Sequence, residues 1–313
     1  MLHRLAGSPE GAAPGGTIGG SSARSASWFT IAALAALLLL CYAGVLYHLV
    51  LHWTKDQDMG HGFFVPFVAA YVAWHERARL REVKWEPSYW GLVLVLWGAL
   101  QMLAGSLGAE LFLARTAFLI SLVGLILAVA GRAVLRELAF PLTLLLFMIP
   151  IPRIVYSQIT LPLQFFASQV AETLLGLIGI PVLRDGNILQ LPSETLSVVE
   201  ACSGIRSLLS LSFLSLIYAY LFDGKVWMRW ALLISTVPIA IAANAGRITL
   251  TGILGEYKPA LAHGFFHTLE GGMLFLVAIV ILVATHRFLN WFYNGYTAAR
   301  ARKAAMHNDG EQP

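Results

Sequence analysis

Charged residues are scarce in this chain of 313 residues, because Asp, Glu, Lys and Arg together make up only 12% of it. Soluble globular domains usually carry about a quarter of their residues charged. Hydrophobic residues reach 58%, and the mean hydropathy is +0.72. These values exclude a water-soluble protein with a single core and predict an all-α polytopic membrane protein. The formal net charge is only +4, so nucleic acid is not expected as a partner.

Cysteine is almost absent as well. The chain contains only Cys41 and Cys202, which excludes a disulfide framework and a multi-cysteine metal site. Their predicted depths differ by about half a hydrocarbon core, roughly 15 Å, which is too far for a disulfide between them. Cys41 lies in mid-span without a polar neighbour and is interpreted as a small buried hydrophobe. Cysteine chemistry, if the protein uses it, therefore falls to Cys202.

Long apolar runs predict about eight transmembrane helices, since crossing a bilayer takes roughly 20 apolar residues. The runs lie at 28–53, 62–74, 90–107, 111–130, 138–151, 204–222, 226–254 and 269–286. With the N-terminus in the cytoplasm, fourteen of the 21 Lys and Arg residues lie inside and four outside. This bias follows the positive-inside rule and predicts that both termini are cytoplasmic. The second and fifth runs are short and contain proline, but omitting them would reverse the bias.

The regions outside these runs complete the predicted organisation. Residues 1–27 are rich in Gly, Ser, Ala and Pro and are expected to be a disordered cytoplasmic tail. Residues 28–289 form a single membrane domain, and 290–313 a cytoplasmic C-terminal tail.

The longest stretch between predicted spans lies between the fifth and the sixth. Its first part, 155–178, is apolar but contains Pro162 and several Gln and Ser residues, which favours an interfacial or re-entrant helix. Its second part carries the turn signal Asp185-Gly186-Asn187 between short β-prone runs, so we expect a small β-hairpin on the outer side. No internal repeat of the kind found in many secondary transporters is evident.

Cys202 lies in the sequence Glu-Ala-Cys-Ser-Gly-Ile-Arg-Ser, where the sixth span begins at the outer surface. A helix N-terminus favours the thiolate, which is the nucleophilic form of cysteine. Arg206 follows four residues later on the same helix face, and Arg247 follows Asn244 by three. An ionisable side chain within a span is a functional candidate. The alternative for either arginine is snorkelling to the headgroups or pairing with Glu200.

His267 precedes the eighth span and is therefore also expected at the outer surface. A histidine there can take the proton of a thiol and later protonate a leaving amine. Glu270, one turn later, could fix the imidazole tautomer. His263 lies four residues before His267, and the residues alone do not choose between the two histidines. The arginine guanidinium keeps its proton at physiological pH and so cannot act as a base. Its use would be to stabilise an oxyanion or to hold a carboxylate.

Other polar residues on this side have open roles. His61, Asp56 and Asp58 stand before the second span, and Arg115 is assigned no role beyond that of an ion-pair candidate. Gly264 follows His263 where the His-Glu-x-x-His pattern of a zinc protease requires glutamate. Neither a Gly-x-Ser-x-Gly elbow nor a phosphate-binding loop is present. The sequence thus predicts neither a metal nor a cofactor.

Three blocks together resemble the exosortase/archaeosortase family of membrane-embedded cysteine proteases. They are Glu-Ala-Cys-Ser-Gly-Ile-Arg-Ser at 200–207, Asn-Ala-Gly-Arg-Ile at 244–248 and Phe-Phe-His-Thr-Leu-Glu-Gly at 265–271. His-Gly-Phe-Phe-Val-Pro at 61–66 is similar to the motif of the family's second span. The resemblance covers roughly residues 30–290.

This resemblance implies that Cys202 is the nucleophile, Arg247 the essential arginine and His267, rather than His263, the third catalytic residue. Arg206, Asn244, Glu200, Glu270 and His61 are the expected supporting or substrate-binding residues. The implied substrates are exported proteins with a C-terminal Pro-Glu-Pro signal, one transmembrane helix and a basic cytoplasmic end. Their acidic residue is expected near Arg206 or Arg247.

The predicted location is the bacterial inner membrane, where the chain contacts lipid, with the active site on the periplasmic side. Two alternatives belong to other functional classes. One is a transporter or lipid-binding protein, and the other is a scaffold subunit for exopolysaccharide export.

Overall fold

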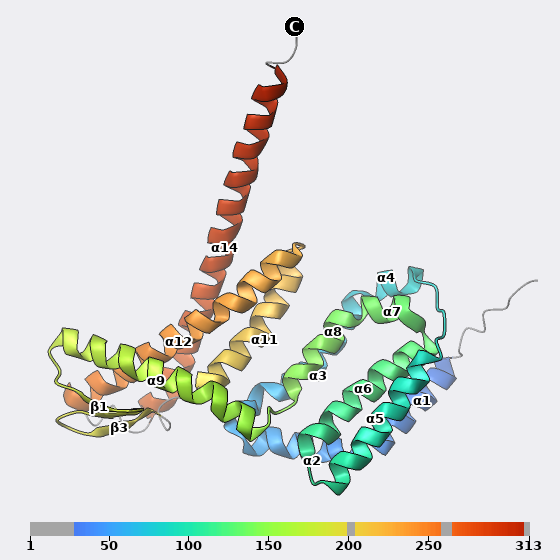
Figure 1. The fold of residues 1–313 in the computed structure, drawn as a ribbon, viewed down its shortest axis with the longest axis horizontal. Coiled ribbons are helices and arrows are strands. Elements are labelled where there is room, and N and C mark those ends of the chain that lie inside the picture. Colours follow the sequence, from blue (N-terminus) through green and yellow to red (C-terminus); the bar gives the residue numbers. More distant parts are fainter. Residues whose placement is uncertain (1–27, 199–203, 258–264, 310–313) are drawn as a thin grey trace, which may run out of the picture.

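The computed structural model describes residues 28–198, 204–257 and 265–309, and most of these residues are helical. The expected disordered tail at 1–27 lies outside the described residues. Figure 1 shows the helices, whose bounds are α1 (Trp28–Cys41), α2 (Ala43–Lys55), η1 (Gln57–Phe63), α3 (Phe64–His75), α4 (Arg77–Glu82), α5 (Trp90–Leu107), α6 (Leu111–Val129), α7 (Gly131–Glu137), α8 (Ala139–Leu144), η2 (Leu145–Met148), α9 (Arg153–Ile178), α11 (Gly204–Phe222), α12 (Val226–Tyr257) and α14 (Phe265–Asp309). The strands are β1 (Leu183–Asp185), β2 (Ile188–Gln190) and β3 (Thr195–Ser197).

Five helices in the described residues are long and apolar enough to cross a membrane, and a sixth crossing results if α1 and α2 count as one bent span. This confirms a helical protein with several apolar spans. The predicted second span corresponds to the 12-residue α3, and the fifth to α8 followed by η2. The count of eight spans, the side of each terminus and the side of the hairpin stay predictions.

The first predicted span is bent, not straight: α1 and α2 meet at 66°. Tyr42 stands at the break with φ −100° and ψ 9°, and its side chain is 3% exposed. Its hydroxyl group lies 2.8 Å from the Ser121 Oγ atom and 3.3 Å from the Ala117 carbonyl oxygen, both on α6. Since a buried hydroxyl needs a hydrogen-bond partner, this contact fixes where α1 crosses α6. The bend then turns α2 toward η1.

The hairpin of α5 and α6 is packed backbone to backbone. Gly91, Gly98 and Gly105 recur at seven-residue intervals on α5 and are all buried. A Cβ atom at Gly91 would lie 2.2 Å from the Ala128 backbone nitrogen, and one at Gly98 would lie 2.1 Å from the Ser121 Oγ atom. Only glycine permits this approach, because neither contact is sterically allowed for a carbon atom.

The helix expected at 155–178 is present as α9, which continues through Pro162 for 26 residues. It is one of the five helices long and apolar enough to cross a membrane, so its interfacial or re-entrant placement stays a prediction. In Figure 1, α9 lies across the lower part of the molecule, transverse to α14. The expected hairpin is also present, because β1 pairs with β2 in antiparallel register, with Asp185 opposite Ile188. Gly186 has a φ of +62° at the first turn position, which is the position that a type II′ turn reserves for glycine. A third strand, β3, extends the sheet and leads toward the segment at 199–203.

Three buried clusters hold these elements together. The first joins α2, η1, α3, α6 and η2 to Phe213 of α11. The second joins α9 and the sheet to Ile248 of α12, and the third joins α11, α12 and α14. Consequently α11 belongs to the first and third clusters, and α12 to the second and third.

A polar cluster fixes the loop between α11 and α12 to α14. The carboxylate of Asp223, which is 8% exposed, lies 3.1 Å from the His286 Nε2 atom and accepts a hydrogen bond from Asn290. The Tyr218 hydroxyl group lies 2.9 Å from the His286 Nδ1 atom. Burial opposes ionisation of Asp223, but hydrogen bonds from the Lys225 amide, His286 and Asn290 outweigh it and lower the pKa of Asp223.

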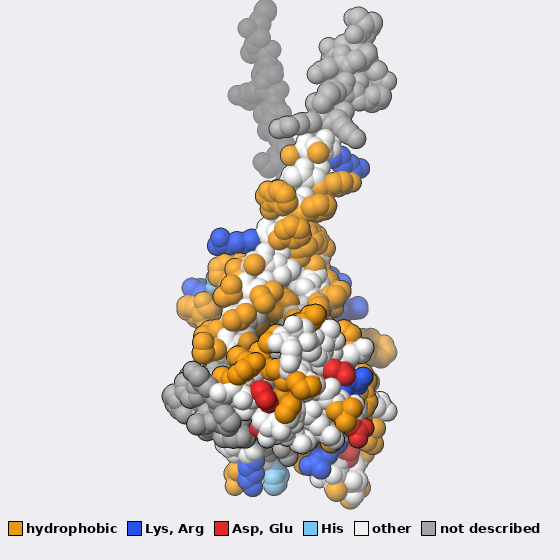
Figure 2. Space-filling model, turned by 90° about the vertical axis from the view of Figure 1, so that its left-hand side faces the viewer, with side chains coloured by type: hydrophobic (Ala, Val, Ile, Leu, Met, Phe, Trp, Pro, Cys, Tyr) orange, Lys and Arg blue, Asp and Glu red, His pale blue; other side chains and the backbone are white. Residues whose placement is uncertain are grey.

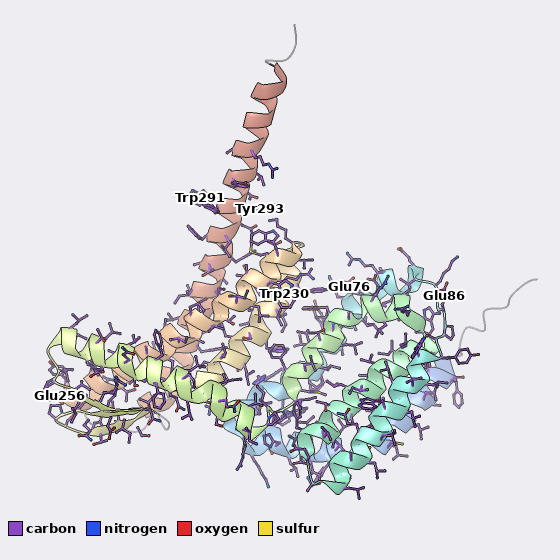
Figure 3. The ribbon with its side chains drawn as sticks, in the orientation of Figure 1. Glu76, Glu86, Trp230, Glu256, Trp291 and Tyr293 are labelled. Carbon is purple, nitrogen blue, oxygen red and sulfur yellow. The ribbon has the colours of Figure 1, made fainter. Side chains whose placement is uncertain are left out.

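Aromatic residues mark one end of the bundle. In Figure 3, Trp230 lies near the upper end of α12 and Glu256 at its opposite end, while Trp291 and Tyr293 lie about midway along α14. Trp230 and Trp291 are 62% and 72% exposed, and exposed tryptophans are typical of a membrane–water boundary. In Figure 2, hydrophobic side chains cover much of the upright part of the visible face, and the visible acidic side chains lie in its lower part.

Candidate functional site

The segment that carries Cys202 and Glu200, residues 199–203, lies outside the described residues, but both of its flanks are anchored. On one side, Val198 is fully buried in the cluster that contains Ile248, the residue after Arg247. The Val198 amide donates a hydrogen bond to the Asn187 carbonyl oxygen at 2.9 Å. On the other side, α11 begins at Gly204. The described chain thus stops just after the β-sheet on one side of this segment and resumes with α11 on the other.

Asp58 is the partner of Arg206. The Arg206 Nε and NH2 nitrogens lie 2.9 Å and 2.8 Å from the Asp58 Oδ1 atom. The Tyr156 hydroxyl group donates to the Asp58 Oδ2 atom at 2.7 Å. Asp58 thus connects η1 with α9 and with the first turn of α11. The α11 residue that it contacts, Arg206, lies only four residues after Cys202 in the sequence.

This ion pair answers a question that the sequence left open. Sequence reasoning offered Arg206 either the lipid headgroups or Glu200 as partner, and the described residues give it Asp58, 148 residues away along the chain. Arg206 therefore faces a carboxylate of the protein itself, and its expected contact with the acidic residue of a substrate stays a prediction.

His61 and Trp53 hold the η1 turn in place against η2. The Trp53 Nε1 group donates to the Met148 carbonyl oxygen at 2.9 Å, and the His61 Nε2 atom lies 3.2 Å from the Phe147 carbonyl oxygen. A Cβ atom at Gly62 would lie 2.5 Å from the Trp53 Nε1 atom, so the indole ring can pack there only against glycine. Burial lowers the pKa of His61, although hydrogen bonds to backbone oxygens oppose this shift. His61 therefore helps to fix the turn that carries Asp58, and its expected supporting role in the site stays a prediction.

Asn244 and Arg247 share α12, as the sequence predicted. Asn244 is 8% exposed and, with Leu163 of α9 and Leu208 of α11, lines a small cavity. Arg247 is partly buried and precedes Ile248, which is fully buried against α9 and the sheet. The residue after Arg247 therefore packs against the strand region that precedes residues 199–203. Its helix continues for ten more residues, to Tyr257.

His267 and Glu270 lie in the first two turns of α14, and their side chains are outside the described set. His263 belongs to the segment 258–264, which lies outside the described residues. The convergence of Cys202, Arg247 and His267 therefore stays a prediction. Among the side chains that are described, no three of His, Cys, Asp and Glu are grouped as metal ligands.

A cavity of about 320 Å³ adjoins Asp58. Its polar lining comes from α2, the α2–η1 region, α6 and α9, and includes His52, Asp56, Glu110, Arg115 and Arg153. Sequence reasoning gave Arg115 no role in the site. The only sequence signal was a lone arginine near the start of an apolar run, and such a residue is costly in a membrane unless it has a use.

Comparison with known proteins identifies the family. A family model described as transmembrane exosortase matches residues 53–284, which is most of the chain. Searches of curated proteins and of solved structures gave no match. The matched range contains Asp58 and Arg206, the Cys202 segment, Arg247 and the first part of α14. The protein is a member of the transmembrane exosortase family.

Proposed function

We propose that the protein is a cysteine peptidase that cleaves the C-terminal Pro-Glu-Pro sorting signal of exported proteins at the periplasmic face of the inner membrane. The observation that carries the proposal is the match to the exosortase family over residues 53–284. It is supported by the anchoring of both flanks of the Cys202 segment, by Val198 in the core and by Arg206 on Asp58.

In this mechanism the Cys202 thiolate attacks the carbonyl carbon of the scissile peptide bond and forms a tetrahedral intermediate. Arg247 stabilises the negative oxygen of that intermediate, since its guanidinium stays charged at any physiological pH. The C–N bond then breaks, and His267 donates a proton to the leaving amine.

The product of the first half-reaction is a thioester between Cys202 and the substrate carbonyl group. Attack by water releases the processed protein as a free acid. Attack by an amine on a cell-surface molecule instead gives a new amide, as in a transpeptidase. Both outcomes use the same nucleophile and regenerate the thiol.

The basic end of the substrate helix agrees with this placement. A positively charged end is retained in the cytoplasm, so the sorting signal at the other end of the helix emerges at the outer surface. That is the level at which the sequence places Cys202. The alternative function, a transporter or a scaffold subunit for exopolysaccharide export, is not favoured by the family match.

Processing of a tagged substrate tests the proposal. The substrate is co-expressed with the wild-type protein, with Cys202→Ser or with Cys41→Ser at equal membrane abundance. Cys41 was expected to be a buried hydrophobe, but it is exposed at the end of α1. We expect the shorter product with the wild type and with Cys41→Ser. Cys202→Ser should abolish the product, and undiminished processing by this variant would refute the mechanism.

A further inference from the structure

Arg115 is a buried arginine near the start of α6. It is the fifth residue of α6 and only 5% exposed. Its Nε atom is buried without a hydrogen-bond partner, and no ion pair joins it to any described residue. Arginine does not lose its proton, so the charge stays. The N-terminal end of a helix also disfavours a cation.

The three carboxylates that line the cavity with Arg115 each contact another group, although Glu110 also attracts the Arg115 charge. Glu110 caps α6 by accepting from the Phe112 amide at 3.1 Å. Asp56 lies 3.2 Å from His52 and accepts from the Asp58 amide. Asp58 faces Arg206 and Tyr156. The protein thus leaves one buried guanidinium open to the cavity of about 320 Å³ that these residues line.

The cavity is built to receive a short acidic segment with apolar neighbours. Beside Arg115 its wall consists of Met59, Leu111, Phe112, Pro150 and Pro152. A guanidinium binds a carboxylate through two parallel hydrogen bonds, and prolines offer no N–H group that would compete for that carboxylate. A volume of about 320 Å³ lies at the lower end of the range for ligand pockets, which suits a side chain and its immediate neighbours.

The position of the cavity links it to the proposed chemistry. Leu209 of α11 lines it, and Asp58 in its wall holds Arg206, four residues after Cys202. The same helix therefore forms part of the cavity and follows the proposed nucleophile.

We propose that Arg115 is the specificity-determining residue that binds the acidic side chain of the substrate's sorting signal in this cavity. This inference rests on the proposed function for the identity of the substrate. It moves the recognition of the acidic residue from Arg206 and Arg247 to an arginine for which the sequence gave no role.

Binding tests the inference separately from cleavage. The full-length Cys202→Ser protein in phosphatidylcholine nanodiscs is titrated with a fluorescent signal segment that carries either Pro-Glu-Pro or Pro-Gln-Pro. We expect about tenfold tighter binding of the Glu segment, since a site built for one polar group rejects the analogue that lacks it. Arg115→Gln should abolish this preference, and Arg115→Lys should restore part of it. Arg132→Gln, an exposed arginine on α7, is the matched control and should keep the preference.

The outcomes separate the two proposals. A Glu preference that persists in a folded Arg115→Gln protein overturns the inference, and so does equal binding of both segments by the protein with Arg115 intact. A third contrary outcome is a defect of Arg115→Gln that appears only in phosphatidylglycerol nanodiscs and equally for both segments, because the cavity would then hold a lipid phosphate. Failure of the wild type to cleave a segment that it binds with Glu preference would instead refute the proposed function and leave Arg115 as a binding residue.

Discussion

The ion pair between Asp58 and Arg206 offers the sharpest test of how the site is held together. Asp58→Asn removes the negative charge but keeps the size of the side chain, and Arg206→Gln removes the positive charge. Each change should leave α11 less firmly fixed to η1 just after the Cys202 segment. We therefore expect slower substrate processing in both single variants, and no further loss when they are combined.

The size of the effect follows from the contacts. Two nitrogens of Arg206 lie within 2.9 Å of one Asp58 oxygen, and Tyr156 donates to the other oxygen. Hydrogen bonds to charged groups contribute about 1.5–3 kcal/mol each when buried. The Arg206 and Asp58 side chains are 39% and 25% exposed, so solvent screens part of this, as in exposed pairs. We expect a coupling energy of about 1.5 kcal/mol, which corresponds to roughly a tenfold change in rate.

A double-mutant cycle on the initial rate of substrate processing measures this coupling. Glu172→Gln is the matched control, because it breaks the Arg184–Glu172 pair, which has similar exposure but lies between α9 and β1. That control should process substrate at close to the wild-type rate. If the losses from Asp58→Asn and Arg206→Gln simply multiply in the double variant, the two side chains do not act together and the reasoning fails.

Three further predictions concern folding, each measured by thermal unfolding of the detergent-solubilised protein. The lowered pKa of His61 means that the unfolded chain binds a proton more readily than the folded protein just below pH 6.5. Stability should therefore fall as the pH drops through that region. His61→Gln should flatten this pH dependence, and an unchanged slope would contradict a buried neutral ring. Gly91→Ala should destabilise the protein by about 1–3 kcal/mol, because its Cβ atom would lie 2.2 Å from a backbone nitrogen of α6. Gly176 has open space around it, so Gly176→Ala should not destabilise the protein. Equal unfolding midpoints for the two variants would count against the close packing of α5 on α6. Asp223 has a lowered pKa, so its contribution to folding stability is present above the unfolded pKa of 3.8 and is lost as the pH falls below that value. Asp223→Asn should therefore lower the unfolding midpoint at pH 7 but have little effect at pH 3. An equal loss at both pH values would exclude an ionic role.

The predictions from sequence succeeded where the signal is local. The turn at Asp185–Asn187 is a short-range pattern, and β1 and β2 pair around it as expected. The helix at 155–178 forms, with Pro162 accommodated within it. Asn244 and Arg247 lie on one helix, as their spacing of three residues predicted. In each case the physical cause lies within a few residues of the feature.

Features set by distant partners were not predictable. The bend at Tyr42 depends on Ser121, 79 residues later, and nothing within 28–53 other than the tyrosine itself marks the break. The pairing of Arg206 with Asp58 spans 148 residues, and two acidic residues, Asp56 and Asp58, were available near the second span. The burial of Arg115 depends on how α6 packs against α5 and α2. The catalytic contact of Cys202 with Arg247 and His267 is of the same kind and stays a prediction.

The length of α14 has a mechanical consequence. Its 45 residues extend about 68 Å at 1.5 Å per residue, more than twice the thickness of a hydrocarbon core. Residues 291–300 are all exposed, although the Tyr293 ring still lies 5.2 Å from the Trp227 ring and 4.9 Å from the Lys225 Nζ atom. Ala298, Ala299 and Arg300 at the end of this stretch are among the strongest helix formers, whereas Gly295 is among the weakest. A tag or fluorophore joined to the far end of α14 would report on tilting of the helix.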